Sequence, residues 1–414
     1  MTDNRFHIDA MGAQGDGLAH MNGAAVFIPF TLPGEDVTAS RDGSRADLLA
    51  VLRASEARIE PSCTHFGTCG SCALQHWDEA SYLAWKRDKV VDALRGQRIT
   101  CEVTPILPSA PGMRRRATYA LRRTESGMLL GYYEALSHRI VDIVEDPIML
   151  PSIVARFADL RALATLICAT GDAFRMTVTQ TDSGLDIAIA GAGKPTPEQR
   201  LRASDFAVRN RLARVSLDGE IIVEPAKPTV SFGGTAVILP PGGFLQASEP
   251  TEQAMAALVT GHLKRAKKVV DLFSGAGTFS LPLARGADVH AVESDTPALA
   301  ALDRGFRFGS GLRRVTTEKR DLFRRPLTFK ELALYDGLVF DPPRAGAEDQ
   351  AKQIARSTVP FVAAVSCNPV TLARDLAILL AGGYTLRSVT PIDQFLWSPH
   401  VEAVALLEKP RKRR

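Results

Sequence analysis

The stretch VVDLFSGAGTFSLPLA, residues 269–284, decides the fold of the C-terminal part of this 414-residue chain. An apolar strand ends at Asp271, a tight turn with Gly275 and Gly277 follows, and a helix begins after it. From about residue 250 onward, similar strands alternate with helices, in KKVVDLF, DVHAVES, DGLVFD, PFVAAVS, TLRSVTPID and VEAVALLEK. This alternation predicts an α/β domain with a doubly wound, largely parallel sheet.

The glycine turn also narrows the choice of cofactor, because glycine lets the backbone come close to a bound molecule. A nicotinamide-binding turn would carry a third glycine where Ser280 stands, and no Gly-Lys pair of a P-loop follows. S-adenosylmethionine fits better, since it has no pyrophosphate for the helix end to hold. Glu293 closes the next strand, where a carboxylate can bind a ribose diol. Asp321, in KRDLF, is a candidate for the adenine amino group.

A second motif, LVFDPPRAGAE at residues 338–348, places Asp341 at the end of a strand and fixes the turn with two prolines. Amino-group methyltransferases carry a similar motif after their fourth strand, but with an aromatic residue behind the prolines. Arg344 stands there instead. Its guanidinium can bind a carbonyl or phosphate oxygen, which assigns it to the substrate.

Cys367 lies where a buried strand turns into a helix, in AVSCNPVTLARDL at residues 364–376, and Glu402 begins the last strand just beyond His400. A thiol, a carboxylate and a methyl donor are what methylation of uracil carbon 5 requires. A thiolate adds to carbon 6, carbon 5 takes a methyl group from a sulfonium donor, and a carboxylate removes the carbon-5 proton. Cys367, Glu402 and the glycine turn supply these three parts.

Together these motifs resemble the RNA (uracil-5-)-methyltransferase family, in DLFSGAGTFSLPLA, FDPPRAG, SCNPVTLARDL and HVEAVALLEK. By that resemblance Cys367 is the nucleophile, Glu402 is the base, and the target base is flipped out of the RNA. GGFLQ is similar to the family's F-x-Q, which implies that Phe244 stacks on the target base and Gln246 contacts cofactor or uracil. The family's cofactor positions fall, beside the two glycines, on Phe273, Thr278, Glu293, Asp321 and Asp341.

The resemblance extends to the N-terminus and covers nearly the whole chain. GDGLAH and VFIPFTLPGEDV are similar to the family's TRAM domain, an OB-like RNA-binding barrel. CTHFGTCGSCALQHW resembles the iron–sulfur segment of the family's ribosomal RNA branch. Its Cys63, Cys69 and Cys72 have the C-x5-C-x2-C spacing of metal ligands.

Two departures from the family pattern stand out. Ala-Ser follows Gln246 where the family has an asparagine, and Asp146 stands where the iron–sulfur branch has its fourth cysteine. Asp146 is then the fourth ligand of a 4Fe-4S cluster, or the cluster has three irons (3Fe-4S). Zinc held with His65 or His76 is another choice, and an empty, vestigial site is the last.

The pattern along the chain predicts four segments. Residues 1–55 indicate a small all-β barrel with turns at Asn22-Gly23 and Pro33-Gly34, and residues 56–100 a cysteine loop followed by an amphipathic helix, 78–96. Residues 101–250 indicate a β-rich central α+β domain with hairpin turns at 182–184 and 218–219 and one helix near 154–170. By the resemblance, residues 251–414 form a Rossmann-like class I methyltransferase domain.

Composition sets the remaining bounds. The chain has no apolar run long enough for a membrane span, and its start lacks the apolar core of a secretory signal. We therefore expect a cytoplasmic protein, a monomer without a membrane partner, whose six cysteines are reduced, metal-bound or catalytic. Net charge is only +4, but the basic residues are clustered, which favours a polyanionic partner. The clusters are at 114–116, 122–123, 264–268, 313–314, 319–320, 324–325 and 411–414.

The sequence as a whole therefore predicts an enzyme that methylates carbon 5 of a specific uridine in RNA. The favoured substrate is 23S ribosomal RNA. Transfer RNA, at its T-loop uridine, is the alternative, and the cysteine loop disfavours it because that branch of the family lacks the cluster. A non-catalytic RNA-binding ribosome-assembly factor would keep the barrel and the basic clusters, but need not keep Cys367 together with Glu402.

Overall fold

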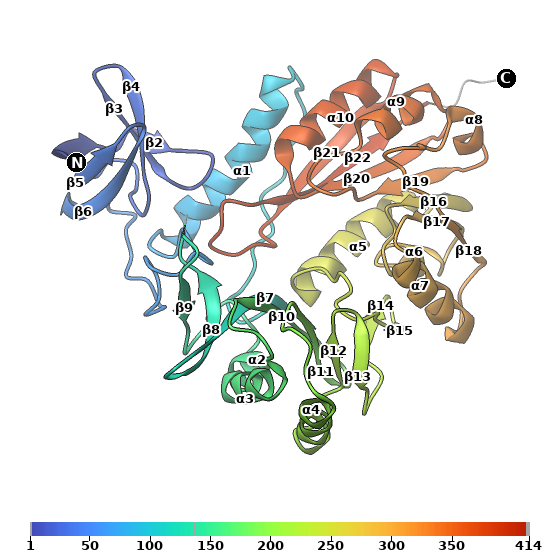
Figure 1. The fold of residues 1–414 in the computed structure, drawn as a ribbon. Coiled ribbons are helices and arrows are strands. Elements are labelled where there is room, and N and C mark those ends of the chain that lie inside the picture. Colours follow the sequence, from blue (N-terminus) through green and yellow to red (C-terminus); the bar gives the residue numbers. More distant parts are fainter. Residues whose placement is uncertain (1, 136, 411–414) are drawn as a thin grey trace.

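The computed structural model describes residues 2–135 and 137–410, and the basic tail noted above, residues 411–414, lies outside them. Within these residues the chain forms three sheets of six or seven strands and one two-stranded sheet. In Figure 1 the first sheet lies on the left, the second at the bottom and the third at the upper right. Helix α1 (Glu79–Gly96) lies between the first and the third.

Six N-terminal strands form the first sheet: β1 (Thr2–His7), β2 (Ala10–Met11), β3 (Gly17–Met21), β4 (Ala24–Ile28), β5 (Asp36–Asp42) and β6 (Arg45–Arg53). They are mostly antiparallel, in the order β1-β5-β6-β4-β3-β2. Asn22 and Gly23 have positive φ angles of 52° and 78° and form the expected tight turn between β3 and β4. Apolar side chains such as Ile8, Val26 and Ile28 fill the interior.

Helix α1 begins where the sequence predicts, since the Asp78 carboxylate accepts a hydrogen bond from the Ser81 backbone N–H at 3.0 Å. Its buried residues recur every four positions and so share one face: Tyr82, Lys86, Val90 and Leu94. This helix packs against α10 (Pro369–Ala381) and β21 (Thr385–Ile392) of the third sheet. The segment after α1 pairs in parallel with β21 through Val103 and Leu107. Residues 79–107 thus attach the cysteine segment to the third sheet.

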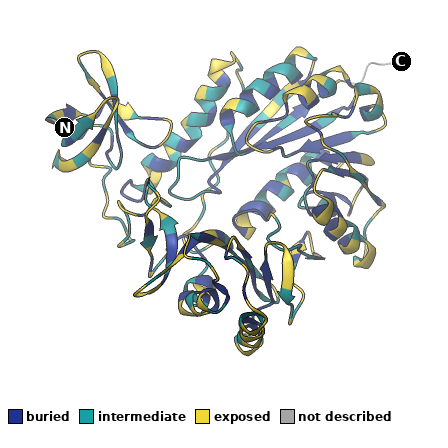
Figure 2. Cartoon of the chain, in the orientation of Figure 1, coloured by how far each residue is buried: buried dark blue, intermediate teal, exposed yellow. Residues whose placement is uncertain are grey.

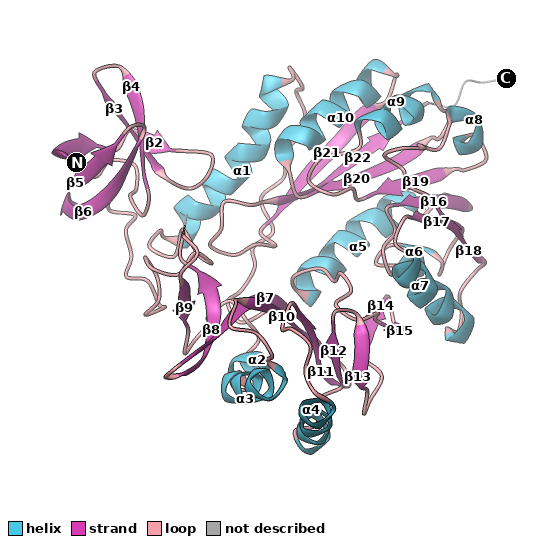
Figure 3. Cartoon of the chain, in the orientation of Figure 1, coloured by secondary structure: helices cyan, strands magenta, loops and turns pink. Residues whose placement is uncertain are grey.

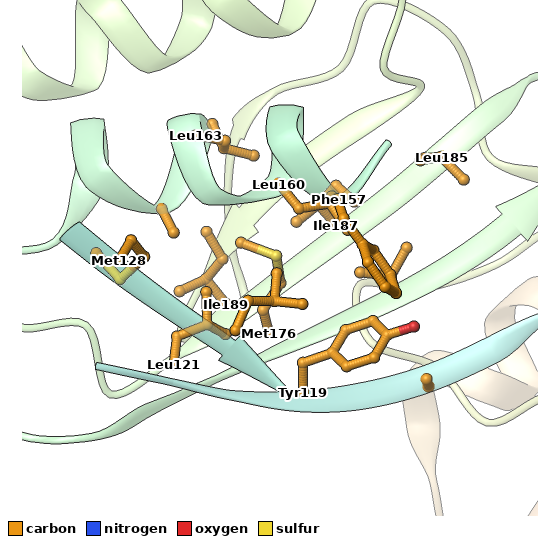
Figure 4. Packing of buried hydrophobic residues seen from close by; sticks show 14 of the residues in the cluster. Tyr119, Leu121, Met128, Phe157, Leu160, Leu163, Met176, Leu185, Ile187 and Ile189 are labelled. Atoms are coloured by element: carbon orange, nitrogen blue, oxygen red, sulfur yellow. The ribbon is translucent and has the colours of Figure 1, made fainter. Parts of the chain in front are cut away.

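The second sheet has the order β13-β12-β11-β10-β7-β8-β9. Its strands are β7 (Arg116–Thr124), β8 (Gly127–Tyr133), β9 (Ile140–Asp142), β10 (Phe174–Thr181), β11 (Gly184–Ala190), β12 (Arg214–Leu217) and β13 (Glu220–Val223). The predicted hairpins at 182–184 and 218–219 are confirmed by the pairing of β10 with β11 and of β12 with β13. Figure 4 shows the core, in which strand residues such as Leu121 and Met176 pack against Leu160 and Leu163 of the covering helix.

Two helical regions of this part differ from the sequence prediction. The single helix predicted near 154–170 is split into α2 (Pro151–Val154) and α3 (Phe157–Ile167). Helix α4 (Pro197–Arg209) was not predicted at all. Its N-terminus is a capping box, in which Thr196 and Gln199 each accept a hydrogen bond from the other's backbone N–H. Thr followed by Gln three residues later is the sequence signal that indicates this helix.

The third sheet has the order β18-β17-β16-β19-β20-β22-β21. Its remaining strands are β16 (Lys268–Leu272), β17 (Asp288–Glu293), β18 (Val315–Lys319), β19 (Gly337–Phe340), β20 (Phe361–Ser366) and β22 (Glu402–Glu408). The first five strands in that order are parallel, which confirms the prediction of a largely parallel sheet. Strand β22 is antiparallel to both of its neighbours. The central strands β16, β19, β20 and β22 are mostly buried, whereas the edge strand β18 is largely exposed or half-buried (Figure 2).

Helices cover both faces of this sheet (Figure 3). On one face lie α5 (Glu249–Leu263), α6 (Ser280–Leu283) and α7 (Thr296–Phe308). On the other lie α8 (Phe329–Leu332), α9 (Glu348–Arg356) and α10. The two-stranded sheet of β14 (Thr229–Phe232) and β15 (Thr235–Ile238) packs on α7. None of the helices described here is both long enough and apolar enough to cross a membrane.

This topology brings the two predicted catalytic residues together. Ser366, at the end of β20, pairs with Ala403, at the start of β22. Cys367 and Glu402, each one residue further, therefore lie side by side although 35 positions separate them in the sequence. The carboxyl ends of the parallel strands β16, β17 and β19 open onto the same edge, which is where ligands bind in open α/β sheets.

Candidate active site

One cavity of about 510 Å³ opens at this edge of the third sheet. Its volume falls within the ~300–1,000 Å³ that is usual for small-molecule sites. Almost all of the residues that the sequence analysis singled out for cofactor, substrate and catalysis line it. They are Phe244, Gln246, Phe273, Gly275, Thr278, Glu293, Asp321, Asp341, Arg344, Cys367 and Glu402.

Gly277 is the member of that set that does not line the cavity wall. Its φ angle is 106°, and a Cβ atom there would come within 2.5 Å of Leu302 Cδ1. Glycine is therefore required for the turn to pack on α7 rather than for contact with a ligand. Gly275 does line the cavity, with a φ angle of 52°, and an added Cβ would meet no atom within 4 Å.

A buried carboxyl supports the glycine turn from behind. Asp271, at the end of β16, accepts a hydrogen bond from the Ser280 hydroxyl at 2.6 Å, and its Oδ1 has no partner among the described residues. Burial raises the pKa of Asp271 to about 7, and the nearby Asp341 and Glu293 carboxylates add to that shift. The turn thus rests on a group that is partly protonated at neutral pH.

Glu293 joins the glycine turn to the end of β17. One carboxylate oxygen accepts a hydrogen bond from the Gly275 N–H at 3.1 Å. The other accepts from the N–H groups of Ser294 and Asp295, at 2.6 and 2.9 Å. The carboxylate is held rigidly at the cavity wall, where it can also accept hydrogen bonds from a diol.

An aromatic pair forms the far wall of the cavity. The rings of Phe273 and Phe323 lie with their centroids 5.5 Å apart, and Phe323 is half exposed. Asp321 lies beside them and accepts the Phe323 N–H at 3.0 Å. Phe323 was not predicted as a site residue. The sequence feature that could have indicated it is an aromatic residue two positions after Asp321 in a mostly polar stretch. An aromatic side chain there can contact a flat heterocycle.

Cys367 and Glu402 meet at the inner end of the cavity. The pKa of the Cys367 thiol is raised to about 11, chiefly by burial and also by the Glu402 and Asp341 carboxylates, while the Arg344 guanidinium opposes the shift. Burial also raises the pKa of Glu402 well above its usual value, with Asp341 adding to the effect. Glu402 lines the cavity, and its buried Oε1 has no hydrogen-bond partner among the described residues. This oxygen therefore keeps its capacity to accept a hydrogen bond or a proton.

A chain of amide side chains links the catalytic carboxyl to the cofactor side of the cavity. Gln394 Nε2 donates to Glu402 Oε2 at 3.1 Å and to Gln246 Oε1 at 2.8 Å. Gln246 Nε2 in turn donates to Asp341 Oδ2 at 3.1 Å. Thr251 fixes the orientation of Gln394 by donating to its Oε1 at 3.1 Å. Gln394 was not predicted as a site residue, because no local pattern in DQFLWSPH marks it out.

The two predicted substrate residues besides Gln246 lie at the mouth. Phe244 is 67% exposed, so its ring is free to contact a ligand. The Arg344 guanidinium is 3.1 Å from His400 Nδ1. Burial and the positive charges of Arg344, Lys89 and Lys86 lower the pKa of His400 to about 4, so it is neutral at pH 7.

The predicted metal residues are brought together but do not form a ligand set. Cys63, Cys69, Cys72 and Asp146 line one small cavity, together with His65. Yet within residues 2–135 and 137–410 no group of three or more His, Cys, Asp or Glu side chains is placed to hold a metal ion. Asp146 accepts a hydrogen bond from the Tyr132 hydroxyl at 2.8 Å. The sequence prediction of a metal centre is therefore not supported by the geometry.

The two histidines considered for zinc are not placed as ligands either. His65 Nε2 accepts the Val144 N–H at 3.0 Å. His76 is buried among the rings of Phe30 and Phe66, and burial lowers its pKa to about 4. Of the two, only His65 lines the cavity of the three cysteines.

The comparisons with known proteins agree with the cavity. A family model described as tRNA (Uracil-5-)-methyltransferase matches residues 311–410. A protein of Mesorhizobium japonicum named as an uncharacterized RNA methyltransferase is 63% identical over 99% of this chain and 99% of its own length. The 23S rRNA (uracil(1939)-C(5))-methyltransferase of Halomonas elongata is 32% identical, over 97% of this chain and 89% of its own. The chain belongs to the RNA (uracil-5-)-methyltransferase family, and it is an S-adenosylmethionine-dependent enzyme of that class.

A solved structure shares the fold. The tRNA (uracil-54, C5)-methyltransferase of Pyrococcus abyssi, in complex with S-adenosyl-L-homocysteine, matches with a TM-score of 0.77 and 23% sequence identity. The match covers 97% of this chain and 99% of that one. The fold is therefore shared over nearly the whole chain.

Proposed function

We propose that this enzyme methylates carbon 5 of a specific uridine in RNA, with 23S ribosomal RNA as the substrate. The observation that carries the proposal is the meeting of a thiol, a carboxyl with a free oxygen and a glycine turn in one cavity. Cys367 and Glu402 line this cavity together, and its volume of about 510 Å³ is large enough for a uracil ring beside a cofactor. The ribosomal substrate is supported by the Halomonas elongata relative, whose likeness spans nearly the whole chain.

The chain's own residues account for the covalent steps. The Cys367 thiolate adds to carbon 6 of the uracil, and the ring becomes an enolate whose carbon 5 is nucleophilic. After methylation, Glu402 removes the proton from carbon 5 through its free oxygen, and the electron pair released expels the Cys367 sulfur from carbon 6. Arg344 is placed beside the thiol, where its charge favours the thiolate and can bind the developing enolate oxygen.

The cavity fits S-adenosylmethionine by its charge as well as its shape. S-adenosylmethionine, when bound, supplies a methyl group from a positively charged sulfonium. The residues that would hold it are Gly275 and Thr278 on the turn, Glu293 at the ribose, Asp321 at the adenine, and Asp341 with Gln246 near the amino acid part. Buried carboxyls with raised pKa values, at Asp341 and Glu402, are stabilised by an incoming cation.

Substrate choice can be tested without assuming it. Mapping of 5-methyluridine in ribosomal and transfer RNA, from cells with and without the gene, should show one missing site in 23S ribosomal RNA. A missing site in the T-loop of transfer RNA would move the assignment to the other branch of the family. Unchanged methylation in both would favour the third reading, a non-catalytic factor of ribosome assembly.

The N-terminal sheet is the proposed RNA-binding barrel of the TRAM type, and residues 1–55 the corresponding domain. Its support is the resemblance of its sequence and the six curled strands. We propose the other segments with the bounds expected from the sequence. They are a cysteine loop and helix at 56–100, a β-rich central domain at 101–250 and a methyltransferase domain at 251–414. We also propose a cytoplasmic monomer. Arg114 and Arg116 line the mouth of the catalytic cavity and are the nearest candidates for phosphate contacts.

The cysteine segment is proposed as an iron–sulfur site, 4Fe-4S with Asp146 as fourth ligand or 3Fe-4S without it. Its support is the shared cavity and the spacing. Burial raises the pKa of Cys72 to about 12, and Asp146 and Cys69 add to that shift, so a cation would be needed to hold the thiolates. Protein purified without oxygen should contain iron and sulfide. Protein that contains only zinc, or no metal, would contradict the proposed cluster.

A further inference from the structure

A second cavity lies on the other side of the catalytic cysteine. It has a volume of about 720 Å³ and runs between the first sheet, α1 and the start of α10. Cys367 and Arg344 line both this groove and the catalytic cavity. The nucleophile therefore lies at the junction of two spaces, of which the reaction at one uracil ring occupies only the first.

Aromatic and apolar side chains form the walls of this groove. Trp85, half-buried on α1, lies with its ring centroid 5.7 Å from that of Trp77. Val370, in the first turn of α10, is 67% exposed and lines the opposite wall, and Met11 comes from the first sheet. Such walls suit a flat, weakly polar ring more than a charged group.

Lys89 fixes the geometry of the groove. Its ammonium lies 4.5 Å from the centroid of the Trp85 ring. It also donates a hydrogen bond at 2.7 Å to the carbonyl of Ala13, in the first sheet's loop, and another to the carbonyl of Pro399. One side chain thus ties three separate parts of the chain around Trp85 and covers one face of its ring, so a ligand can stack only on the other face.

The charges of the two spaces differ. Arg344 lines both spaces, whereas Arg114 and Arg116 line only the catalytic cavity. The groove has Asp88 and Asp92 along α1, and its Lys89 is already bonded to carbonyls. A phosphate is disfavoured there by the two carboxylates, whereas a nucleobase carries no charge to repel.

We propose that this groove is a subsite for a nucleobase of the same RNA strand, next to the methylated uridine, which stacks on Trp85. The inference rests on the proposed function. When a uridine is bonded to Cys367, the adjacent nucleotides of the RNA strand must lie close to that residue. Stacking of a base on an aromatic ring does not depend strongly on which base it is. The subsite therefore orients the strand and adds affinity without selecting one particular base.

The test is a coupling measurement between Trp85 and the RNA. The probe is a 23S ribosomal RNA fragment that carries the unmodified target uridine, with a single abasic nucleotide placed in turn at each neighbouring position. Binding is measured by fluorescence anisotropy in the presence of S-adenosyl-L-homocysteine, which prevents turnover. At one position the abasic change should weaken wild-type binding about 10-fold, as expected for loss of one stacked base.

Trp85→Ala should weaken binding of the intact fragment by a similar factor. The abasic change at that one position should then cause no further loss of affinity in this variant. Trp85→Phe should recover most of the affinity, because it keeps a ring. Phe308→Ala is the matched control, since Phe308 is an exposed aromatic residue outside both cavities. Independent, additive losses at every position, or wild-type affinity in Trp85→Ala, would overturn the subsite and leave the groove to a protein partner.

A second readout needs no variant and covers the case in which Trp85→Ala fails to fold. 2-Aminopurine at the same RNA position should lose fluorescence on binding to the wild-type enzyme, because stacking quenches it. Unquenched emission in the bound complex contradicts the proposal. Methylation of the same fragment is measured in parallel. If the fragment is methylated but Trp85 and the RNA position show no coupling in binding, only the subsite is contradicted. If the fragment is not methylated, the proposed function itself is contradicted.

Discussion

Cysteines occupy two sites in this chain, and the two differ in what surrounds the sulfur. At Cys367, burial raises the thiol pKa to about 11, but Arg344 opposes that shift and a cavity of about 510 Å³ opens beside it. At Cys72, burial raises the pKa to about 12, with Asp146 adding to the shift, and the groups that oppose it are the uncharged side chains of Gln75 and Ser71. The cavity there is only about 20 Å³.

This difference separates a site for reaction from a site for structure. A cavity of about 20 Å³ holds roughly one water molecule, so no nucleobase can reach the cysteine segment. Only a group that becomes part of the fold could bind its thiols. The space at Cys367 admits a ring, and the carboxyl opposite it keeps one oxygen free. The surroundings, and not the thiol itself, define which cysteine reacts.

The largest expected effect is at the reacting cysteine. Cys367→Ala should lower methyl transfer to RNA by at least about 10³-fold, because no other thiol lines the cavity. Transfer of labelled methyl groups to RNA measures it. Cys101→Ala, a half-buried thiol outside the cavity, is the control and should retain activity. Substantial turnover by Cys367→Ala would erase the distinction between the two cysteine sites.

A smaller loss is expected at the residue that orients the base. Gln394→Leu removes the donor to Glu402 and should lower kcat by roughly 10- to 100-fold, the usual effect of a hydrogen bond to a charged group. That hydrogen bond lowers the pKa of Glu402. Without it the pKa rises, so the limb of the kcat–pH profile that reports the ionised base should move to higher pH. An unshifted profile would make Gln394 a packing residue.

Binding of the cofactor should itself release protons from the catalytic cavity. Burial raises the pKa of Asp341 to about 7, so this carboxyl is partly protonated near neutral pH in the free enzyme, and burial raises the pKa of Glu402 above its usual value. A sulfonium cation favours their ionised forms. Calorimetry in buffers of different ionisation enthalpy should show proton release with S-adenosylmethionine, and less with the uncharged thioether S-adenosyl-L-homocysteine. Equal release with both would contradict the account.

The cysteine segment should matter least for the chemistry. It contacts the loop between β21 and β22 through the Trp397 carbonyl, which accepts the N–H groups of Ala73 and Leu74 at 2.9 and 3.1 Å. Replacing Cys63, Cys69 and Cys72 together by serine should remove any iron but lower kcat by less than about 10-fold, since these two backbone hydrogen bonds remain. A loss as large as that of Cys367→Ala would mean that the two sites act as one.

Much of the catalytic cavity could be predicted from local sequence. The turn at Gly275 and the strand ends at Glu293 and Asp341 follow from short patterns, because each residue's place is set by the strand or turn that carries it. The parallel order of the sheet follows in the same way. The catalytic pair came from the chemistry of Cys367 and Glu402, and the pairing of β20 with β22 places the two together.

What the sequence could not give depends on contacts between distant segments. Gln394 gains its place only when Thr251 and Gln246 pack against it. Phe323 becomes part of the wall only beside Phe273. Among the described residues, the geometry does not support the ligand set that was predicted for the metal centre. Local spacing suggested a ligand set, but its fourth position depends on Asp146, which comes from another segment and is hydrogen-bonded elsewhere.

The most direct test of the account is the fate of RNA on the Glu402→Gln enzyme. This variant keeps the size of the side chain but cannot accept the carbon-5 proton. It should still attack and still methylate, and then accumulate a protein–RNA adduct that survives denaturation and disappears when Cys367→Ala is added. Gel electrophoresis with labelled RNA measures it. Full turnover by Glu402→Gln without an adduct would contradict the assignment of Glu402 as the base that ends the reaction.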